Sequence, residues 1–254
     1  MLPTKSLVKF QCVCRAWLDY IRDPMFIRKH IQDRASKGFG FCDGTNDYNI
    51  VRIVSPSNYR NNKTHTKIEV YSLMMSSWNI IEVDYFPWEV IDARSEVLLN
   101  ESIHWKAIYG DGVNDGEDIM VLLAFHLGNQ SFRQLSLPHY DGDGEDLMEH
   151  LGVIKGNISL FLFHMTDWNE PCFLWVMKEY GVEDSWTKTH SIVIDPGVVI
   201  PLVFTKNDEI LFEDAEHGFI VYHFDSKTSN VLGLEDDGYL NVVKYVESLV
   251  MLED

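Results

Sequence analysis

Three acidic residues in one loop form the pattern in this sequence that comes closest to a metal site. Asp141, Asp143 and Glu145 occupy alternating positions, as the first ligands of a calcium-binding loop do. Such a loop needs a glycine at its sixth position for a sharp turn and a glutamate at its twelfth. Asp146 stands at the sixth position, and the twelfth is not a glutamate. We therefore expect a solvated acidic turn here and no bound metal.

Cys12 and Cys14 are the closest pair of thiols, and zinc binding is the chemistry that they could support. Structural zinc sites use a Cys-x-x-Cys spacing with a second pair of ligands nearby. These two cysteines have neither feature. We expect them to be helical side chains that face a core or a partner.

The residues that could serve acid, base or nucleophilic catalysis form no recognisable motif. No Gly-x-Ser-x-Gly elbow, phosphate-binding loop or His-Glu-x-x-His helix occurs. Four histidines fall in predicted strands, where we expect ordinary half-buried or exposed imidazoles: His104, His126, His164 and His223. Trp78, Trp175 and Trp186 are expected to pack between strands and not to form a ligand-stacking platform. The sequence thus predicts neither an enzyme nor a cofactor.

A repeated block organises most of the chain. Two β-rich runs around a polar tight turn occupy residues 67–83 and return at residues 121–138, 172–192 and 219–234. With Val70, Ala124, Trp175 and Val221 as equivalent positions, the spacings are roughly 54, 51 and 46 residues. This is close to the period of kelch-type propeller blades.

Further β-rich runs precede the repeated blocks. They lie at residues 102–109, 152–163 and 202–212, and a hairpin with an Asp43-Gly44 turn is predicted at residues 36–54. Each unit thus carries the three or four strands that a propeller blade requires, and the closing run at residues 239–252 could complete the first blade. We predict a mainly β fold, a kelch-like β-propeller of about four blade-like repeats.

The first thirty residues have a different pattern. Leu7, Phe10, Cys14, Trp17 and Ile21 recur at helical spacing and give one apolar face. Asp23-Pro24 ends this segment and starts a short second helix. Such a helical pair cannot form a core alone, so its apolar faces need the rest of the chain or a partner. We predict two parts, a helical segment at residues 1–33 and a β domain at residues 36–254.

Composition limits the classes of partner. The chain of 254 residues is 46% hydrophobic, enough to bury a sizeable core. Its formal charge of −18 disfavours nucleic acid and anionic membranes, which need Lys and Arg to neutralise phosphate. A basic protein partner is compatible with this charge, although an acidic surface also simply confers solubility.

The same sequence indicates an intracellular protein of the cytoplasm or nucleus. No window approaches a membrane span, and Lys5 and Lys9 interrupt any secretory signal segment. In such a reducing compartment all four cysteines are expected to be free thiols.

Two stretches carry a resemblance to a known family. Residues 2–21, LPTKSLVKFQCVCRAWLDYI, resemble the second half of a plant F-box. From Gly38 onward the chain resembles the type-1 F-box-associated domain of plant F-box/kelch-repeat proteins, close to the pollen S-locus F-box group. The segments that carry this likeness are GFGFCDGTNDYNIVRI, EVYSLMMSSWNII, FLWVMKEYGVEDSWTK and YVESLVML. Compared with the family, the chain resembles a member shortened at the N-terminus and internally, with only a remnant of the helical F-box.

The resemblance implies a non-catalytic function. It implies the substrate-recognition subunit of a Skp, cullin and F-box ubiquitin ligase, which binds a Skp-type adaptor, through it cullin, and a protein substrate of unknown identity. The implied adaptor contacts are Pro3, Leu7, Cys12, Val13 and Trp17; the alternative is that some of them pack on the β domain. A stand-alone propeller module for protein interactions and a non-functional truncated family member are the other possibilities, and a hydrolase or lectin is a weaker one.

Overall fold

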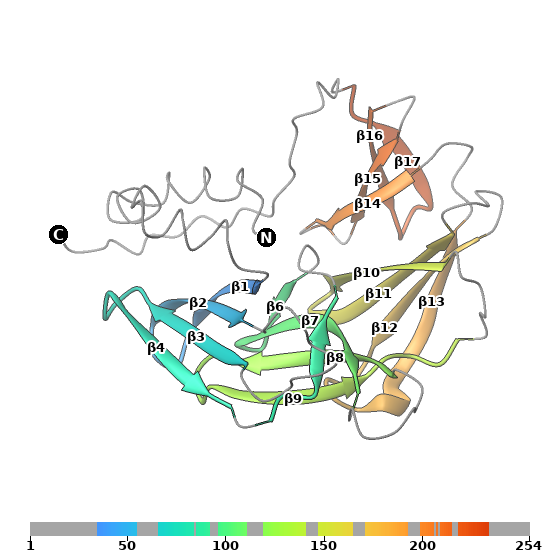
Figure 1. Ribbon diagram of the computed structural model, residues 1–254. Helices are drawn as coiled ribbons and strands as arrows, with labels where there is room; N and C mark the ends of the chain where they lie inside the picture. The colour runs from blue at the N-terminus through green and yellow to red at the C-terminus, as the bar shows by residue number, and fades with distance from the viewer. Residues whose placement is uncertain are drawn as a thin grey trace. The chain divides into compact units, whose positions relative to one another are not determined.

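The computed structural model describes most of the predicted β domain (Figure 1). The described residues are 35–54, 66–83, 85–91, 96–110, 119–140, 147–164, 171–192, 199–205, 207, 209–214 and 218–233. The helices predicted within residues 1–33 and the closing run at residues 239–252 lie outside these ranges.

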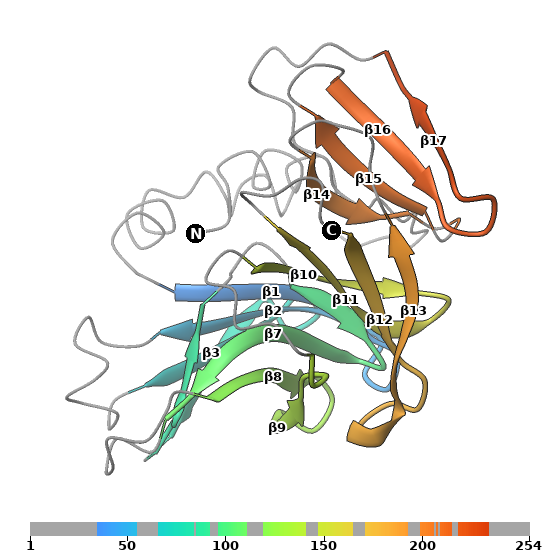
Figure 2. The same cartoon turned by 90° about the vertical axis from the view of Figure 1, so that its right-hand side faces the viewer.

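The described chain forms four antiparallel sheets, as the repeats predict (Figures 1 and 2). In the described residues the only helix is a short 3-10 turn, η3 (Glu183–Ser185). The strands of the described residues fall in two compact units, one before and one after the boundary between Gln134 and Leu135. We call these the first and the second unit.

The first unit holds two sheets. One runs β1 (Ala35–Cys42), β2 (Asp47–Val54), β3 (Lys67–Ser72) and β4 (Ser77–Glu82) in sequence order. The other contains β5 (Trp88–Val90), β6 (Val97–Leu99), β7 (Ser102–Tyr109), β8 (Ile119–His126) and β9 (Ser131–Ser136), whose last two residues belong to the second unit. β5 and β6 both pair with β7, so two short pieces share the position of one strand.

The second unit holds the other two sheets, again in sequence order. The third sheet contains β10 (Leu147–Ile154), β11 (Asn157–His164), β12 (Cys172–Met177) and β13 (Trp186–Ile192). The fourth contains β14 (Val199–Phe204), β15 (Glu209–Asp214), β16 (Gly218–His223) and β17 (Thr228–Val231). The sheets are simple meanders, in which each strand pairs with its neighbours along the chain.

The repeat prediction is confirmed at the level of single strands. Val70, Ala124, Trp175 and Val221 lie in β3, β8, β12 and β16, the third strand position of each sheet. The predicted hairpin at residues 36–54 is β1 and β2. One detail differs from the prediction: residues 152–163, predicted as one β-rich run, contain the turn of a hairpin and parts of two strands. Lys155 and Gly156, with φ of 49° and 72°, form its left-handed two-residue turn between β10 and β11.

Close backbone approach joins the two sheets within each unit. A Cβ built on Gly38 of β1 would stand 2.5 Å from Ile103 Cγ2 of β7. Trp105, completely buried in β7, donates its indole N–H to the carbonyl of Lys37 in β1, at 3.1 Å. The glycine in β1 thus makes room for the large side chains of β7, and the two sheets of the first unit share one core.

The second unit has its own core. Phe161 of β11 and Phe212 of β15 are both fully buried, with ring centroids 5.5 Å apart. Side chains of β16 alternate between the two faces of its sheet. Ile220 and Tyr222 face this core, while His223 points to the other side. The fold is therefore mainly β with four blade-like sheets, in agreement with the prediction.

Candidate functional site

The predicted adaptor contacts cannot be placed. Pro3, Leu7, Cys12, Val13 and Trp17 lie outside the described residues, as do Cys14 and the acidic turn of Asp141, Asp143 and Glu145. The assignment of these residues therefore stays a prediction. Among the described residues, no three His, Cys, Asp or Glu side chains are arranged to hold a metal ion.

The four strand histidines lie in strands, as predicted, but one differs from expectation. His126, His164 and His223 are half-buried, whereas His104 in β7 is completely buried. Burial lowers the pKa of His104 to about 4. Its Nδ1 lies 3.3 Å from the Val97 carbonyl, a contact that favours the protonated ring but does not offset the cost of burial. His104 is therefore a neutral core residue at physiological pH.

The two described cysteines, Cys42 and Cys172, are buried free thiols, in agreement with the prediction. Burial raises the pKa of Cys172 to about 11, so its thiol is protonated and unreactive at neutral pH. Cys42 is completely buried and donates a hydrogen bond to Glu101 Oε2 at 3.3 Å. Neither cysteine therefore has the exposed, electropositive environment of a catalytic nucleophile.

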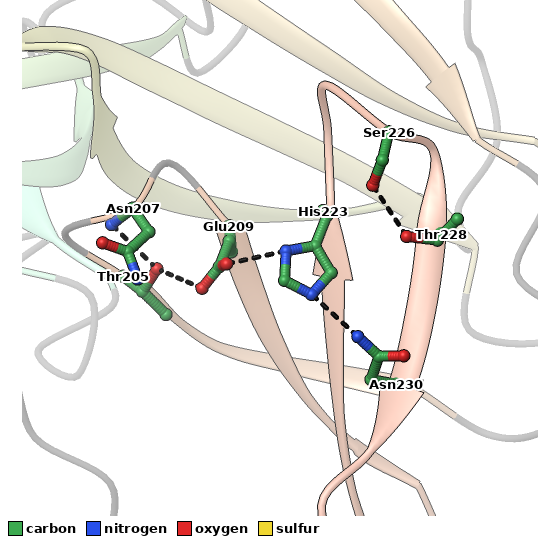
Figure 3. Close-up of polar contacts among 7 residues, drawn as sticks. All are labelled: Thr205, Asn207, Glu209, His223, Ser226, Thr228 and Asn230. Carbon is green, nitrogen blue, oxygen red and sulfur yellow. Dashed lines mark hydrogen bonds and ion pairs between the residues drawn. The ribbon is translucent and has the colours of Figure 1, made fainter.

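The fourth sheet carries a polar network that resembles a catalytic relay (Figure 3). His223 Nδ1 lies 2.7 Å from Glu209 Oε1 on the neighbouring strand. Thr205 donates its hydroxyl to the other carboxylate oxygen, at 3.0 Å. Asn230 of β17 donates its amide N–H to His223 Nε2, also at 3.0 Å. The network links the start of β15, the end of β16 and the edge strand β17.

Among the described residues, this network includes no nucleophile at the place where a hydrolase needs one. The Asn230 amide occupies His223 Nε2, the nitrogen that would take a proton from an attacking hydroxyl. Ser226 and Thr228 are exposed and bond to each other, 2.7 Å apart, and among the described residues neither bonds to His223 (Figure 3). The arrangement therefore serves to hold three strands together.

The turn between β3 and β4 presents two large apolar side chains to solvent. Met74 is 62% and Met75 is 69% exposed, the highest values among the exposed large hydrophobic side chains of the described residues. We refer to residues 73–76 as the methionine turn. The predicted tight turn forms here, but it is polar only in part, because Met74 and Met75 stand where the later repeats have polar residues.

A buried carboxylate holds this turn in place. Asp47, 5% exposed, accepts a hydrogen bond from the Met74 amide at 2.8 Å and others from the side chains of Ser72 and Asn49. Ser72 in turn accepts the Met75 amide at 3.0 Å. Leu73, the first residue of the turn, is buried and donates its amide to the Tyr48 carbonyl at 3.0 Å. The turn is therefore a built platform and not a loose loop.

Other turns of the first unit join the methionine turn at the same end of the sheets. Glu101, between β6 and β7, accepts the Gly44 amide at 3.1 Å and so ties its turn to the β1–β2 turn. Asn79 next to the methionine turn donates to Gln130 of the β8–β9 turn, at 3.0 Å. Asp43 is exposed in the β1–β2 turn. The result is one connected rim that combines apolar and acidic groups.

Comparison with known proteins decides the family. Residues 13–251 match the family described as the F-box associated beta propeller domain. The chain belongs to this family. The resemblance expected from the sequence is thereby confirmed, and the four sheets are blades of an F-box associated propeller.

Curated relatives come from Arabidopsis thaliana. The F-box protein CPR1 is 25% identical over 78% of this chain and 52% of its own length. The F-box protein At4g22390 is 24% identical over 84% of this chain and 56% of its own length. The F-box/kelch-repeat protein At3g23880 is 25% identical over 69% of this chain and 45% of its own length. The chain thus spans about half the length of the curated relatives that it matches.

Within this F-box associated domain, the methionine turn is the surface that sequence reasoning missed. The signal was present in the segment Leu-Met-Met-Ser-Ser, which places apolar residues where the other repeats have Gly, Asn, Asp or Lys. The buried role of Asp47 had no local signal, because its partner Met74 lies 27 positions away in the sequence. No helix of the described residues has the length and apolar character needed to span a membrane.

Proposed function

We propose that this protein is the substrate-recognition subunit of a Skp, cullin and F-box type ubiquitin ligase. The observation that carries the proposal is the match of residues 13–251 to the F-box associated propeller family. The names of three relatives as F-box proteins and of a fourth as an F-box/kelch-repeat protein support it. Such a complex operates inside the cell, so the proposal includes a cytoplasmic or nuclear location.

The proposed mechanism is positional. The N-terminal segment binds a Skp-type adaptor, and through it cullin, while the propeller holds a protein substrate. The ubiquitin-carrying enzyme of the complex then reacts with a substrate lysine because the two are held at high effective concentration. In this mechanism the protein itself supplies no catalytic group.

The proposed adaptor contacts are Pro3, Leu7, Cys12, Val13 and Trp17. Leu7 and Trp17 fall on the same apolar face at helical spacing. Interfaces concentrate their binding energy in a few large side chains, each worth about 2 kcal/mol or more on truncation. Trp17 is therefore expected to dominate the affinity.

Calorimetric titration of a purified Skp-type adaptor into the full chain tests the proposal. We expect the wild type to bind and Trp17→Ala to bind at least about tenfold more weakly. Lys9→Ala is the matched control, since it changes the same segment outside the apolar face, and it should bind as the wild type does. Absence of binding by a folded wild type would refute the ligase function and favour a stand-alone interaction module.

A further inference from the structure

The methionine turn is an apolar surface that the fold keeps in contact with water. Met74 and Met75 are 62% and 69% exposed, although Leu73 beside them is buried. Their backbone is fixed by Asp47 and Ser72, so the exposed position of the two residues is set by hydrogen bonds and not by local freedom. A methionine side chain adapts its shape to varied apolar partners, which suits a surface that binds other proteins.

The rim around this turn is acidic. Asp43 is exposed, Glu101 is half-buried, and Asp47 lies just below the turn. The four connected turns, residues 42–47, 72–77, 99–102 and 126–131, contain no Lys or Arg. A ligand for this surface therefore gains from apolar groups over the methionines and from positive charge beside them.

The backbone of Glu101 shows how firmly one of these acids is placed. Glu101 has a φ of 54° and Asn100 a φ of 50°, so a non-glycine residue adopts the left-handed region in a two-residue turn. Its carboxylate accepts hydrogen bonds from Gly44 and Cys42 of the neighbouring sheet. The negative charge is thus fixed beside the β1–β2 turn that carries Asp43.

Charge complementarity selects one kind of occupant. Nucleic acid would be repelled by these acids. A second copy of this chain placing the same face against this one would bring like charges together, in a protein whose net charge is −18. A segment of another protein with Lys or Arg next to an apolar side chain meets both features of the surface.

We propose that the methionine turn, with Asp43 and Glu101, is the docking surface for an extended substrate segment that carries an apolar side chain next to Lys or Arg. This inference rests on the proposed function, because it assigns the substrate-binding part of the same receptor. The apolar side chain lies on Met74 and Met75, and the cation lies toward Asp43 and Glu101.

Selection from a phage-displayed random heptapeptide library on the full chain tests the proposal. The proposal predicts selected peptides in which Lys or Arg adjoins a large apolar residue. Synthetic copies of the selected peptides then serve as the probe in titrations. Failure to enrich any sequence, or enrichment of sequences without a basic residue, would overturn the proposal.

The location of binding is tested by methyl NMR of protein labelled with ¹³C at the methionine methyl groups. The signals of Met74 and Met75, assigned through Met74→Leu and Met75→Leu, should shift on addition of the peptide. Met148 in β10 is the internal control, because it is 43% exposed but belongs to the second unit. A shift at Met148 with none at Met74 and Met75 would contradict the assignment.

Variants separate the two parts of the surface. Met74→Ser with Met75→Ser should weaken peptide binding at least about tenfold, and Met148→Ser should leave it unchanged. Asp43→Asn should weaken it by about threefold at low salt, and the wild-type affinity should fall with added salt. Equal affinity of the wild type and the double methionine variant would refute the proposal.

The adaptor titration keeps this inference distinct from the proposed function. Met74→Ser with Met75→Ser should bind the Skp-type adaptor as the wild type does. If peptide binding at the turn is found but adaptor binding is not, the docking surface stands and the ligase function fails. The opposite result refutes the docking surface alone.

Discussion

Gly152 of β10 lies against the ring of Phe204 of β14, and a Cβ added to Gly152 would stand 1.9 Å from Phe204 Cδ2. The contact joins the two sheets of the second unit. Phe204 is itself buried, so its ring has little space to move away. The close packing of these two sheets therefore requires a glycine at position 152.

Replacement of this glycine should therefore be costly. We expect Gly152→Ala to lower the free energy of unfolding by about 1–3 kcal/mol, the usual cost of overpacking a core. Gly44→Ala is the control, because the nearest heavy atom to its Cβ would be 3.6 Å away. Urea unfolding followed by circular dichroism gives the comparison, and equal midpoints for the two variants would show that the contact can relax.

The carboxylate under the methionine turn should stabilise the first unit. Asp47→Ala leaves the Met74 amide and the side chains of Ser72 and Asn49 without their shared acceptor. We expect the free energy of unfolding to fall by about 2 kcal/mol. Asn79→Ala, which removes an exposed side-chain hydrogen bond, should cost less than about 0.5 kcal/mol. The free energies of unfolding of the two variants are compared by urea unfolding. Equal values would show that Asp47 is dispensable for stability.

The polar network of the fourth sheet should likewise stabilise the second unit. His223→Ala breaks the contacts that connect β15, β16 and β17 and should destabilise the protein by about 1–2 kcal/mol. Ser226→Ala changes an exposed hydroxyl pair nearby and should have almost no effect. A neutral His223→Ala would mean that the edge strand does not depend on the network.

The repeat pattern was sufficient to predict the sheets because it reflects local chemistry. Val70, Ala124, Trp175 and Val221 recur at near-constant spacing, and each lies in the third strand position of its sheet. Strand pairs along the chain need only short connections, so alternating β-rich runs and turns specify them well. The hairpin at Lys155-Gly156 was missed, because its two-residue turn interrupts an otherwise continuous β-rich run.

Of the candidate surface, only the apolar segment Leu-Met-Met-Ser-Ser has a local signal in the sequence, and the contacts that hold it have none. The Met74 amide bonds to Asp47 at a separation of 27 positions, and Glu101 of the β6–β7 turn accepts the Gly44 amide at a separation of 57 positions. The divided strand formed by β5 and β6 was also missed, because each piece has only three residues. Such contacts follow from the packing of sheets, and the sequence contains no local signal for them.

The buried histidine of β7 predicts a pH dependence of stability. His104 has an unfolded pKa near 6.5 and a folded pKa of about 4, so between these values the unfolded chain binds a proton that the folded chain does not. Stability should therefore be highest above pH 6.5 and fall as the pH drops toward 4. The loss expected from this residue is about 3 kcal/mol.

A comparison of variants isolates this contribution from that of the carboxylates. The unfolding free energy of His104→Gln should depend less steeply on pH between 6.5 and 4 than that of the wild type. His139→Gln, which removes an imidazole whose side chain is 98% exposed, controls for the loss of a histidine. Parallel curves for wild type and His104→Gln would contradict the assignment.

The most direct test of the receptor function is a binding measurement with both partners in one experiment. A Skp-type adaptor is immobilised on a biosensor, the full chain is bound to it, and a selected basic-apolar peptide fused to a carrier protein is then added. The account predicts that the chain is captured through its N-terminal segment and that the fusion then binds with the affinity measured for the free chain. Failure of the adaptor to capture the folded chain, or release of the chain when the fusion is added, would contradict it.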